Sequence, residues 1–115
     1  MELDFIWVAV SDLDDSVEFY NEFLQTEPDS VSERMAYYEL EKIGFGLYNS
    51  EYDGWTPEKR GDNTAPAFRV EDLDSEKERI SKLVDDTDEY DAGDHRGFLI
   101  KDPDGNGLEI YSWKE

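Results

Sequence analysis

One carboxylate stands in surroundings that would give it chemistry. Glu109 lies in the alternating stretch Leu108–Trp113, which is typical of a β-strand with one buried face. An unpaired carboxylate is costly to bury. Glu109 therefore lines a wet cavity, meets a cation or faces solvent, and the choice between these three decides what the protein does.

The turn before this strand determines where Glu109 can lie. The stretch Asp102-Pro103-Asp104-Gly105-Asn106 combines a proline that sets φ, side chains that bond their own backbone and a glycine that accepts positive φ. A short strand, residues 97–100, precedes it. The pattern predicts a hairpin whose second strand carries Glu109.

Other reactive residue types are scarce. The chain has no cysteine, which excludes disulfides, a thiol nucleophile and thiolate metal sites. It contains neither a Gly-x-Ser-x-Gly elbow nor a Gly-x-x-x-x-Gly-Lys phosphate loop. We expect the single histidine, His95, to be a partly exposed turn residue.

Composition indicates an acidic folded domain. The 115 residues suit a single domain, and 31 acidic against 11 basic residues give a formal net charge of −20. The acids are spread along the chain and 14% of residues are aromatic, which favours a folded body over an acidic tail. The charge disfavours nucleic acid and anionic membranes as partners. No apolar run approaches the roughly 18–20 residues that span a bilayer, so we expect a soluble, cytoplasmic protein. The large negative charge also predicts a surface adapted to high salt.

The first half of the chain predicts a strand, a helix and three further strands. Residues 3–10 are strand-like, and Asp12 can cap a helix whose apolar stripe runs along one side. Two short strands at 30–34 and 35–41 and a strand at 43–49 follow. The predicted helical stripe consists of Leu13, Val17, Tyr20 and Leu24.

The same pattern then starts again. Residues 65–75 align with residues 5–15 at an offset of 60, with the Asp-Leu-Asp cap in register. The predicted second module covers about 64–115, after a first module at about 1–50 and a linker loop at 50–63. Its helical stripe consists of Leu73, Lys77, Ile80 and Val84, and its later strands lie near 89–90, 96–101 and 108–113.

These residues carry a family resemblance. The two strand–Asp-Leu-Asp–helix units, the run 16–20 (Ser-Val-Glu-Phe-Tyr) and the Asp-Pro-Asp-Gly-Asn-x-x-Glu signature at 102–109 resemble the glyoxalase / bleomycin resistance protein / extradiol dioxygenase (vicinal oxygen chelate) superfamily. The resemblance implies an α+β fold in which two βαβββ modules form a curved mixed-sheet cup with the helices outside. It also implies a frequent homodimer.

The resemblance implies four metal-ligand positions, of which one keeps a ligand. They fall on Phe5, on Ala65, near Tyr48 and on Glu109. Because divalent sites need about three or more protein ligands, we expect no metal, no cofactor and no catalytic residue. The alternative is a metal-dependent lyase, isomerase or dioxygenase with an atypical ligand set, in which His95, Glu39, Glu41 or Asp94 joins Glu109.

Strand parity then predicts what a metal-free cup contains. Residues alternate between the two faces of a strand. Phe5, Trp7, Glu109, Tyr111 and Trp113 therefore point into the predicted cup. Residues of the opposite parity point towards the helices: Ile6, Val8, Val10, Leu108 and Ile110. An aromatic wall with a carboxylate favours a small aromatic or cationic molecule. The predicted ligand-binding residues are Phe5, Trp7, Tyr48, Trp55, Arg69, Glu109, Tyr111 and Trp113.

Three structural alternatives stand beside this site. Phe5 and Trp7 could fill the cup as core, and Glu109 could pair with Arg69. Trp55, in the long loop, is either part of a lid or a dimer contact.

A third functional hypothesis, besides ligand binding and metal-dependent catalysis, is a module that binds no ligand and serves only as a contact surface for a partner or a second copy.

The charge leads to the first testable prediction. Because salt screens the self-repulsion of a net charge of −20, the midpoint of thermal unfolding should rise from low to multimolar KCl. Circular dichroism measures that midpoint. A midpoint that stays flat over this range would remove the high-salt interpretation.

Overall fold

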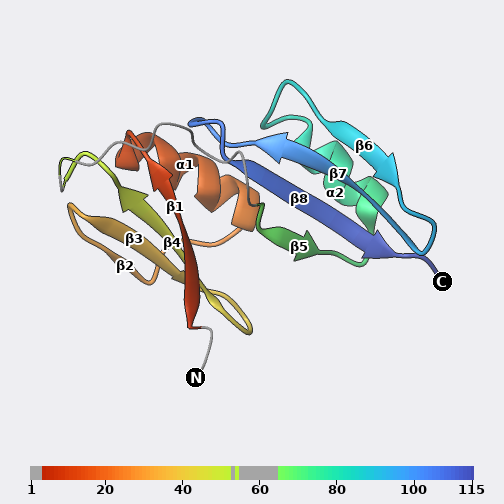
Figure 1. Cartoon of the computed structure of the whole chain (residues 1–115), viewed down its shortest axis with the longest axis horizontal. Coiled ribbons are helices and arrows are strands. Elements are labelled where there is room, and N and C mark those ends of the chain that lie inside the picture. Colours follow the sequence, from red (N-terminus) through yellow and green to blue (C-terminus); the bar gives the residue numbers. More distant parts are fainter. Residues whose placement is uncertain (1–3, 53, 55–64) are drawn as a thin grey trace. The chain divides into compact units, whose positions relative to one another are not determined.

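The computed structural model describes residues 4–52, 54 and 65–115 (Figure 1). The chain divides into two compact units, Met1–Arg60 and Gly61–Glu115, and each is described by itself. Each unit has the element order βαβββ, with a single helix against one face of its own sheet. The predicted α+β fold of two βαβββ modules is confirmed, whereas a cup that both sheets share stays a prediction.

The first unit holds a four-stranded mixed sheet in the order β1-β4-β3-β2. β1 runs parallel to β4, and the other pairs are antiparallel. Its elements are β1 (Phe5–Val10), α1 (Leu13–Leu24), β2 (Ser30–Val31), β3 (Met35–Glu39) and β4 (Gly44–Asn49).

The second unit repeats this arrangement in the order β5-β8-β7-β6. Ala67 pairs with Glu109 as Trp7 pairs with Gly46, so two residues 60 apart in the chain occupy equivalent places. Its elements are β5 (Ala67–Arg69), α2 (Leu73–Ile80), β6 (Asp88–Asp91), β7 (His95–Lys101) and β8 (Gly107–Trp113).

Both helices begin at the predicted aspartates. The Asp12 carboxylate accepts a hydrogen bond from the Asp15 backbone N–H at 3.0 Å, and Asp72 accepts one from Ser75 N–H at 3.1 Å. Each bond satisfies one of the free N–H groups at a helix start. The caps recur because the sequence repeats.

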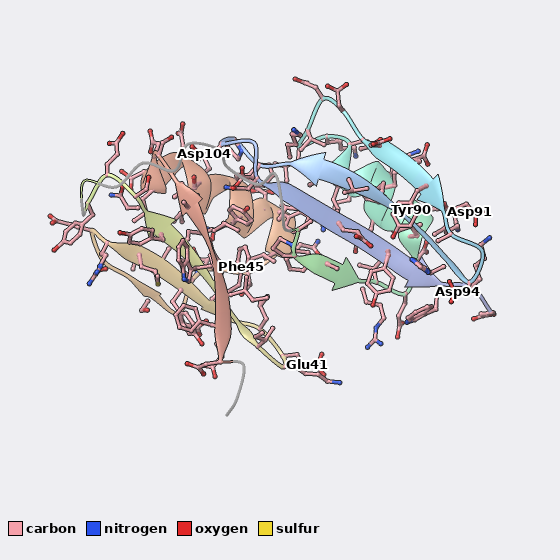
Figure 2. All side chains as sticks on the ribbon, in the orientation of Figure 1. Glu41, Phe45, Tyr90, Asp91, Asp94 and Asp104 are labelled. Carbon is pink, nitrogen blue, oxygen red and sulfur yellow. The ribbon has the colours of Figure 1, made fainter. Side chains whose placement is uncertain are left out.

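The buried side of α1 differs from the predicted stripe. Ser16, Tyr20 and Phe23 are the buried residues of the helix, while Leu13 and Leu24 are only half-buried. Tyr20 meets Phe45 of β4, which is labelled in Figure 2, with ring centroids 5.3 Å apart. The two aromatic rings bury more area than the leucines would, which accounts for the rotated contact face.

The α2 helix is shorter than the stripe predicted. Leu73 and Ile80 are buried as expected, but the helix ends at Ile80 and Val84 lies beyond it. The chain after Ile80 tightens into a turn in which Leu83 N–H donates to the Ile80 carbonyl at 2.8 Å. Bonds over three residues instead of four end the regular α-helix.

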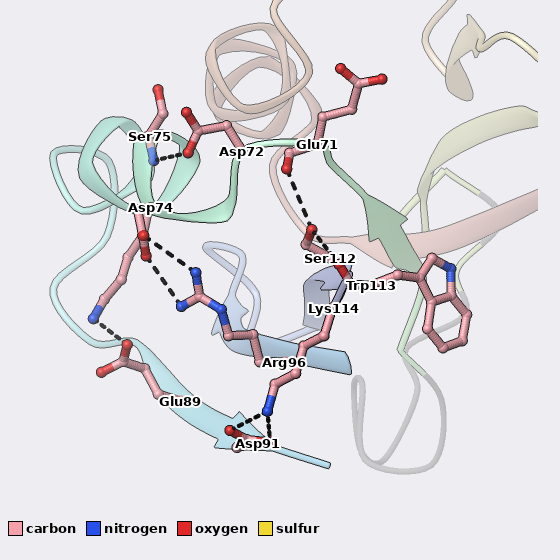
Figure 3. Close-up of polar contacts among 11 residues, drawn as sticks. Glu71, Asp72, Asp74, Ser75, Glu89, Asp91, Arg96, Ser112, Trp113 and Lys114 are labelled. Atoms are coloured by element: carbon pink, nitrogen blue, oxygen red, sulfur yellow. Dashed lines mark hydrogen bonds and ion pairs between the residues drawn. The ribbon is translucent and has the colours of Figure 1, made fainter. Parts of the chain in front are cut away.

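Ion pairs link α2 to its sheet on the helix side (Figure 3). Arg96 of β7 lies 3.2 Å from Asp74, and Lys77 lies 2.5 Å from Glu89 of β6. These groups are partly exposed, so each pair contributes little to stability alone. Charged side chains on the helix-covered face of the second sheet therefore form ion pairs with α2.

The predicted turn at 102–106 joins β7 to β8 and is organised by a buried carboxylate. Asp102, 5% exposed, accepts hydrogen bonds from the backbone N–H groups of Asp104 and Asn106 at 2.9 and 2.8 Å. Its second oxygen accepts from the Asn106 side-chain amide at 2.9 Å. Gly105 has φ +85°, the conformation that glycine tolerates best.

The turn gives the second prediction. Asp102→Ala leaves buried amide donors without an acceptor, so it should lower the free energy of unfolding by about 2–3 kcal/mol. Urea unfolding measures the change. The exposed Asp86→Ala removes the same charge and should change stability by less than about 0.5 kcal/mol. Equal effects of the two variants would show that the turn network is not the cause.

Candidate functional site

The face of the first sheet opposite α1 carries a groove of about 560 Å³. We call it the first-sheet groove. The structure brings together here three of the predicted site residues, Phe5, Trp7 and Tyr48. They share this face because β1 and β4 are paired in register, with Ala9 opposite Tyr48 and Trp7 opposite Gly46. It is lined by Phe5, Trp7, Ser32, Arg34, Met35 and Tyr48.

Two glycines of β4 leave room for neighbouring side chains on this face. A Cβ on Gly44 would overlap the Tyr37 ring, and one on Gly46 would lie 3.3 Å from Trp7 Cβ. Phe5 meets Tyr37 edge-on at 5.8 Å between ring centroids, and Trp7 meets Tyr48 at 5.3 Å. Trp7 is 46% exposed, so its ring is a wall of the groove and not part of a closed core.

The face of the second sheet opposite α2 carries the other predicted residues that the structure describes. Ala67 pairs with Glu109, and Arg69 pairs with Tyr111. Leu108 and Ile110, 0% and 1% exposed, point to the other face, as strand parity predicts. We call this surface the second-sheet face; it includes Arg69, Tyr90, His95, Glu109, Tyr111 and Trp113.

The partner of Glu109 is a tyrosine that sequence reasoning missed. Tyr90 of β6 donates its hydroxyl hydrogen to Glu109 Oε2 at 2.6 Å, whereas the alternative considered from the sequence was a pair with Arg69. Burial, followed by the hydrogen bond to and the charge of Glu109, raises the pKa of Tyr90 to about 12. Tyr90 was not foreseen because β6 is short and mostly acidic, with no alternation to assign it a face.

The single histidine lies in an aromatic cluster at one end of this face. His95 begins β7, is half-buried and has its Nδ1 2.7 Å from Asp94 Oδ1. This hydrogen bond lowers the pKa of Asp94. Ring centroids of Tyr90, Tyr111 and Trp113 lie 5.7, 5.8 and 5.3 Å from the imidazole. His95 is partly exposed, as predicted, but it is the first residue of β7 and not a turn residue.

The residues at the implied metal positions do not fit a divalent ion. Phe5 and Ala65 have no ligand atom, and the register makes Gly46, not Tyr48, the counterpart of Glu109 in the first unit. Glu109 itself is engaged by Tyr90. Across residues 4–52, 54 and 65–115, no three His, Cys, Asp or Glu side chains converge.

Two further predictions concern other parts of the chain. Trp55, the predicted lid or contact residue, lies outside the described residues. In the part of the chain that the structure describes, no helix has the length and apolar character needed to cross a membrane.

Comparisons with known proteins agree with the geometry. The family model described as "Glyoxalase/Bleomycin resistance protein/Dioxygenase superfamily" matches residues 2–110. A glyoxalase/bleomycin resistance protein from Catenulispora acidiphila DSM 44928 has a TM-score of 0.72 and 25% identity, over 98% of this chain and 100% of that chain.

Two further structures are similar at lower identity. A glyoxalase/bleomycin resistance protein/dioxygenase from Nocardioides has a TM-score of 0.78 at 19% identity, covering 100% of this chain and 85% of its own. A lactoylglutathione lyase from Agrobacterium tumefaciens has a TM-score of 0.73 at 19% identity, covering 96% and 92%. At 19% identity these two show the shared fold alone.

The raised pKa of Tyr90 gives the third prediction. An unfolded tyrosine loses its proton near pH 10 and folded Tyr90 near pH 12, so unfolding releases a proton in between. The stability that Tyr90 contributes should be complete below about pH 10 and should decline as the pH rises towards about 12.

Urea unfolding of the wild type and of Tyr90→Phe at pH 8, 10 and 11 measures this. The other tyrosines are common to both proteins and cancel in the difference. The advantage of the wild type over the variant should be smaller at pH 11 than at pH 8. A difference that stays constant would contradict the hydrogen-bonded state of Tyr90.

Proposed function

The chain belongs to the glyoxalase/bleomycin resistance protein/dioxygenase superfamily, and we propose that it is a metal-free member that binds a small aromatic or cationic molecule. The observation that carries this proposal is the first-sheet groove. Exposed Trp7 and half-buried Phe5 and Tyr48 line an open space there.

The size and lining of the groove suit a small planar molecule. Its volume of about 560 Å³ falls within the range of small-molecule sites, about 300–1,000 Å³. Trp7 and Tyr48 offer ring edges and faces, and Met35 adds a soft apolar side chain. Ser32 and Arg34 supply the few polar groups that orient a ligand.

The second-sheet face supports the cationic part of the proposal. Glu109 is a half-buried carboxylate beside Tyr111 on the same strand. An aromatic face and a carboxylate both attract a cation. The net charge of −20 also raises the local concentration of cations around the protein.

The side chains at the implied metal-ligand positions favour the binding of an organic ligand over metal-dependent catalysis. Superfamily enzymes of the metal-dependent kind need several ligands, and this chain offers Glu109 with a tyrosine already bound to it. The aromatic residues Phe5 and Trp7 stand on the strand that would open such a site. Phe5 and Trp7 can instead hold an aromatic ligand by stacking against it.

The fourth prediction tests binding directly. Titration with a panel of aromatic and cationic compounds should give saturable quenching of tryptophan fluorescence. Trp7→Ala should weaken the binding of the best compound by about 1 kcal/mol, or about fivefold, because it removes one aromatic wall.

The neighbouring Ile6→Ala is the matched control. Ile6 is 39% exposed on the same strand but on the opposite face, so its truncation should leave the affinity unchanged. Isothermal calorimetry on the variants replaces the lost fluorophore. The absence of any saturable response across the panel would overturn the proposed function.

A further inference from the structure

The Tyr90–Glu109 hydrogen bond spans a strand that lies between its two partners. Tyr90 is on β6 and Glu109 is on β8, with β7 paired to both. Gly97 of β7 is the register partner of Tyr90, and a Cβ there would lie 2.8 Å from the Tyr90 hydroxyl. The phenol can cross β7 and reach Glu109 because position 97 has no side chain.

This bond engages only one of the two carboxylate oxygens of Glu109. Oε2 accepts from Tyr90, and within the described residues Glu109 has no ion pair and no second hydrogen bond. The register places two basic residues on the same face, Arg69 and Lys101, and neither forms a salt bridge with Glu109. An ionised carboxylate has about four acceptor sites, so a half-buried one with a single donor can accept more.

Glu109 has small neighbours towards β5 and along its own strand, and half-buried Leu99 is its register partner on β7. On β5, Glu109 faces Ala67, and the preceding residue of β8 on the same side is Gly107. Tyr111 follows on that side, and its ring is held edge-on by Trp113 with centroids 5.7 Å apart. A carboxylate oxygen and an aromatic ring thus stand two residues apart on one strand.

We propose that this face recognises a protonated nitrogen that still carries N–H groups, such as an ammonium, an amidinium or a protonated aminoheteroaromatic ring. Glu109 Oε1 accepts from the N–H, and Tyr111 contacts the cation with its ring. Tyr90 acts as a positioning residue that holds the carboxylate through its other oxygen. The inference rests on the proposed function and narrows its ligand class.

The test compares two planar probes of similar shape. Proflavine is cationic at neutral pH and carries amino groups, whereas acridone is neutral. Binding is measured by calorimetry in 0.5 M KCl, where screening removes most of the attraction that a charge of −20 exerts on any cation. The wild type should bind proflavine more tightly than acridone.

Glu109→Gln should weaken proflavine binding at least about tenfold and leave acridone binding unchanged. The control Asp85→Asn removes one negative charge from an exposed position and should change neither affinity. Tyr90→Phe should lower the preference for proflavine over acridone; a merely structural Tyr90 would alter stability without altering this ratio.

A second variant covers the case in which Glu109→Gln fails to fold. Ala67→Lys places an ammonium next to Glu109 and should abolish the preference for proflavine while the protein stays folded by circular dichroism. Equal affinities of the wild type for both probes, or equal effects of Glu109→Gln and Asp85→Asn, would overturn the inference and leave the proposed function standing. If neither probe nor any panel compound binds saturably, both fail.

Discussion

A single helix can cover only one face of a four-stranded sheet, and this constraint shapes both units. Helix α1 takes the face of Phe45 and Leu47, and α2 takes that of Phe98 and Ile110, all of them buried. The alternation of side chains along each strand then decides what the other face carries. Aromatic and charged residues on that face have no helix of their own unit to pack against.

Both free faces use glycine to seat a tyrosine from the neighbouring strand. In the first unit the Tyr37 ring lies over Gly44, and in the second the Tyr90 hydroxyl passes Gly97 to reach Glu109. The outcome differs because the residue equivalent to Glu109 is Gly46. One face becomes an apolar groove, while the other retains a carboxylate with a fixed hydrogen-bond donor.

The sequence predicted the elements well wherever a local signal and the repeat agreed. Asp12 and Asp72 start the helices because the same cap chemistry occurs twice at an offset of 60. The helix stripes were less accurate, since the packing of Tyr20 and Phe23 follows from tertiary contacts that periodicity does not contain. Tyr90 was missed because β6 shows no alternation and because the path of its hydroxyl depends on Gly97, one strand away.

The sequence predicted some residues of the candidate site but not their arrangement. Strand parity assigned Phe5, Trp7 and Glu109 to their faces, yet it could not show that Glu109 meets Tyr90 in place of Arg69. Hydrogen-bond partners across strands depend on register, which the hairpin turn sets only for its own two strands.

The most direct measurement is the metal content of protein purified without chelators, by inductively coupled plasma mass spectrometry on wild type and Glu109→Gln. If Glu109 is held by Tyr90 and serves an organic ligand, both proteins should contain well below one equivalent of any divalent metal. A stoichiometric metal in the wild type that the variant loses would contradict the account.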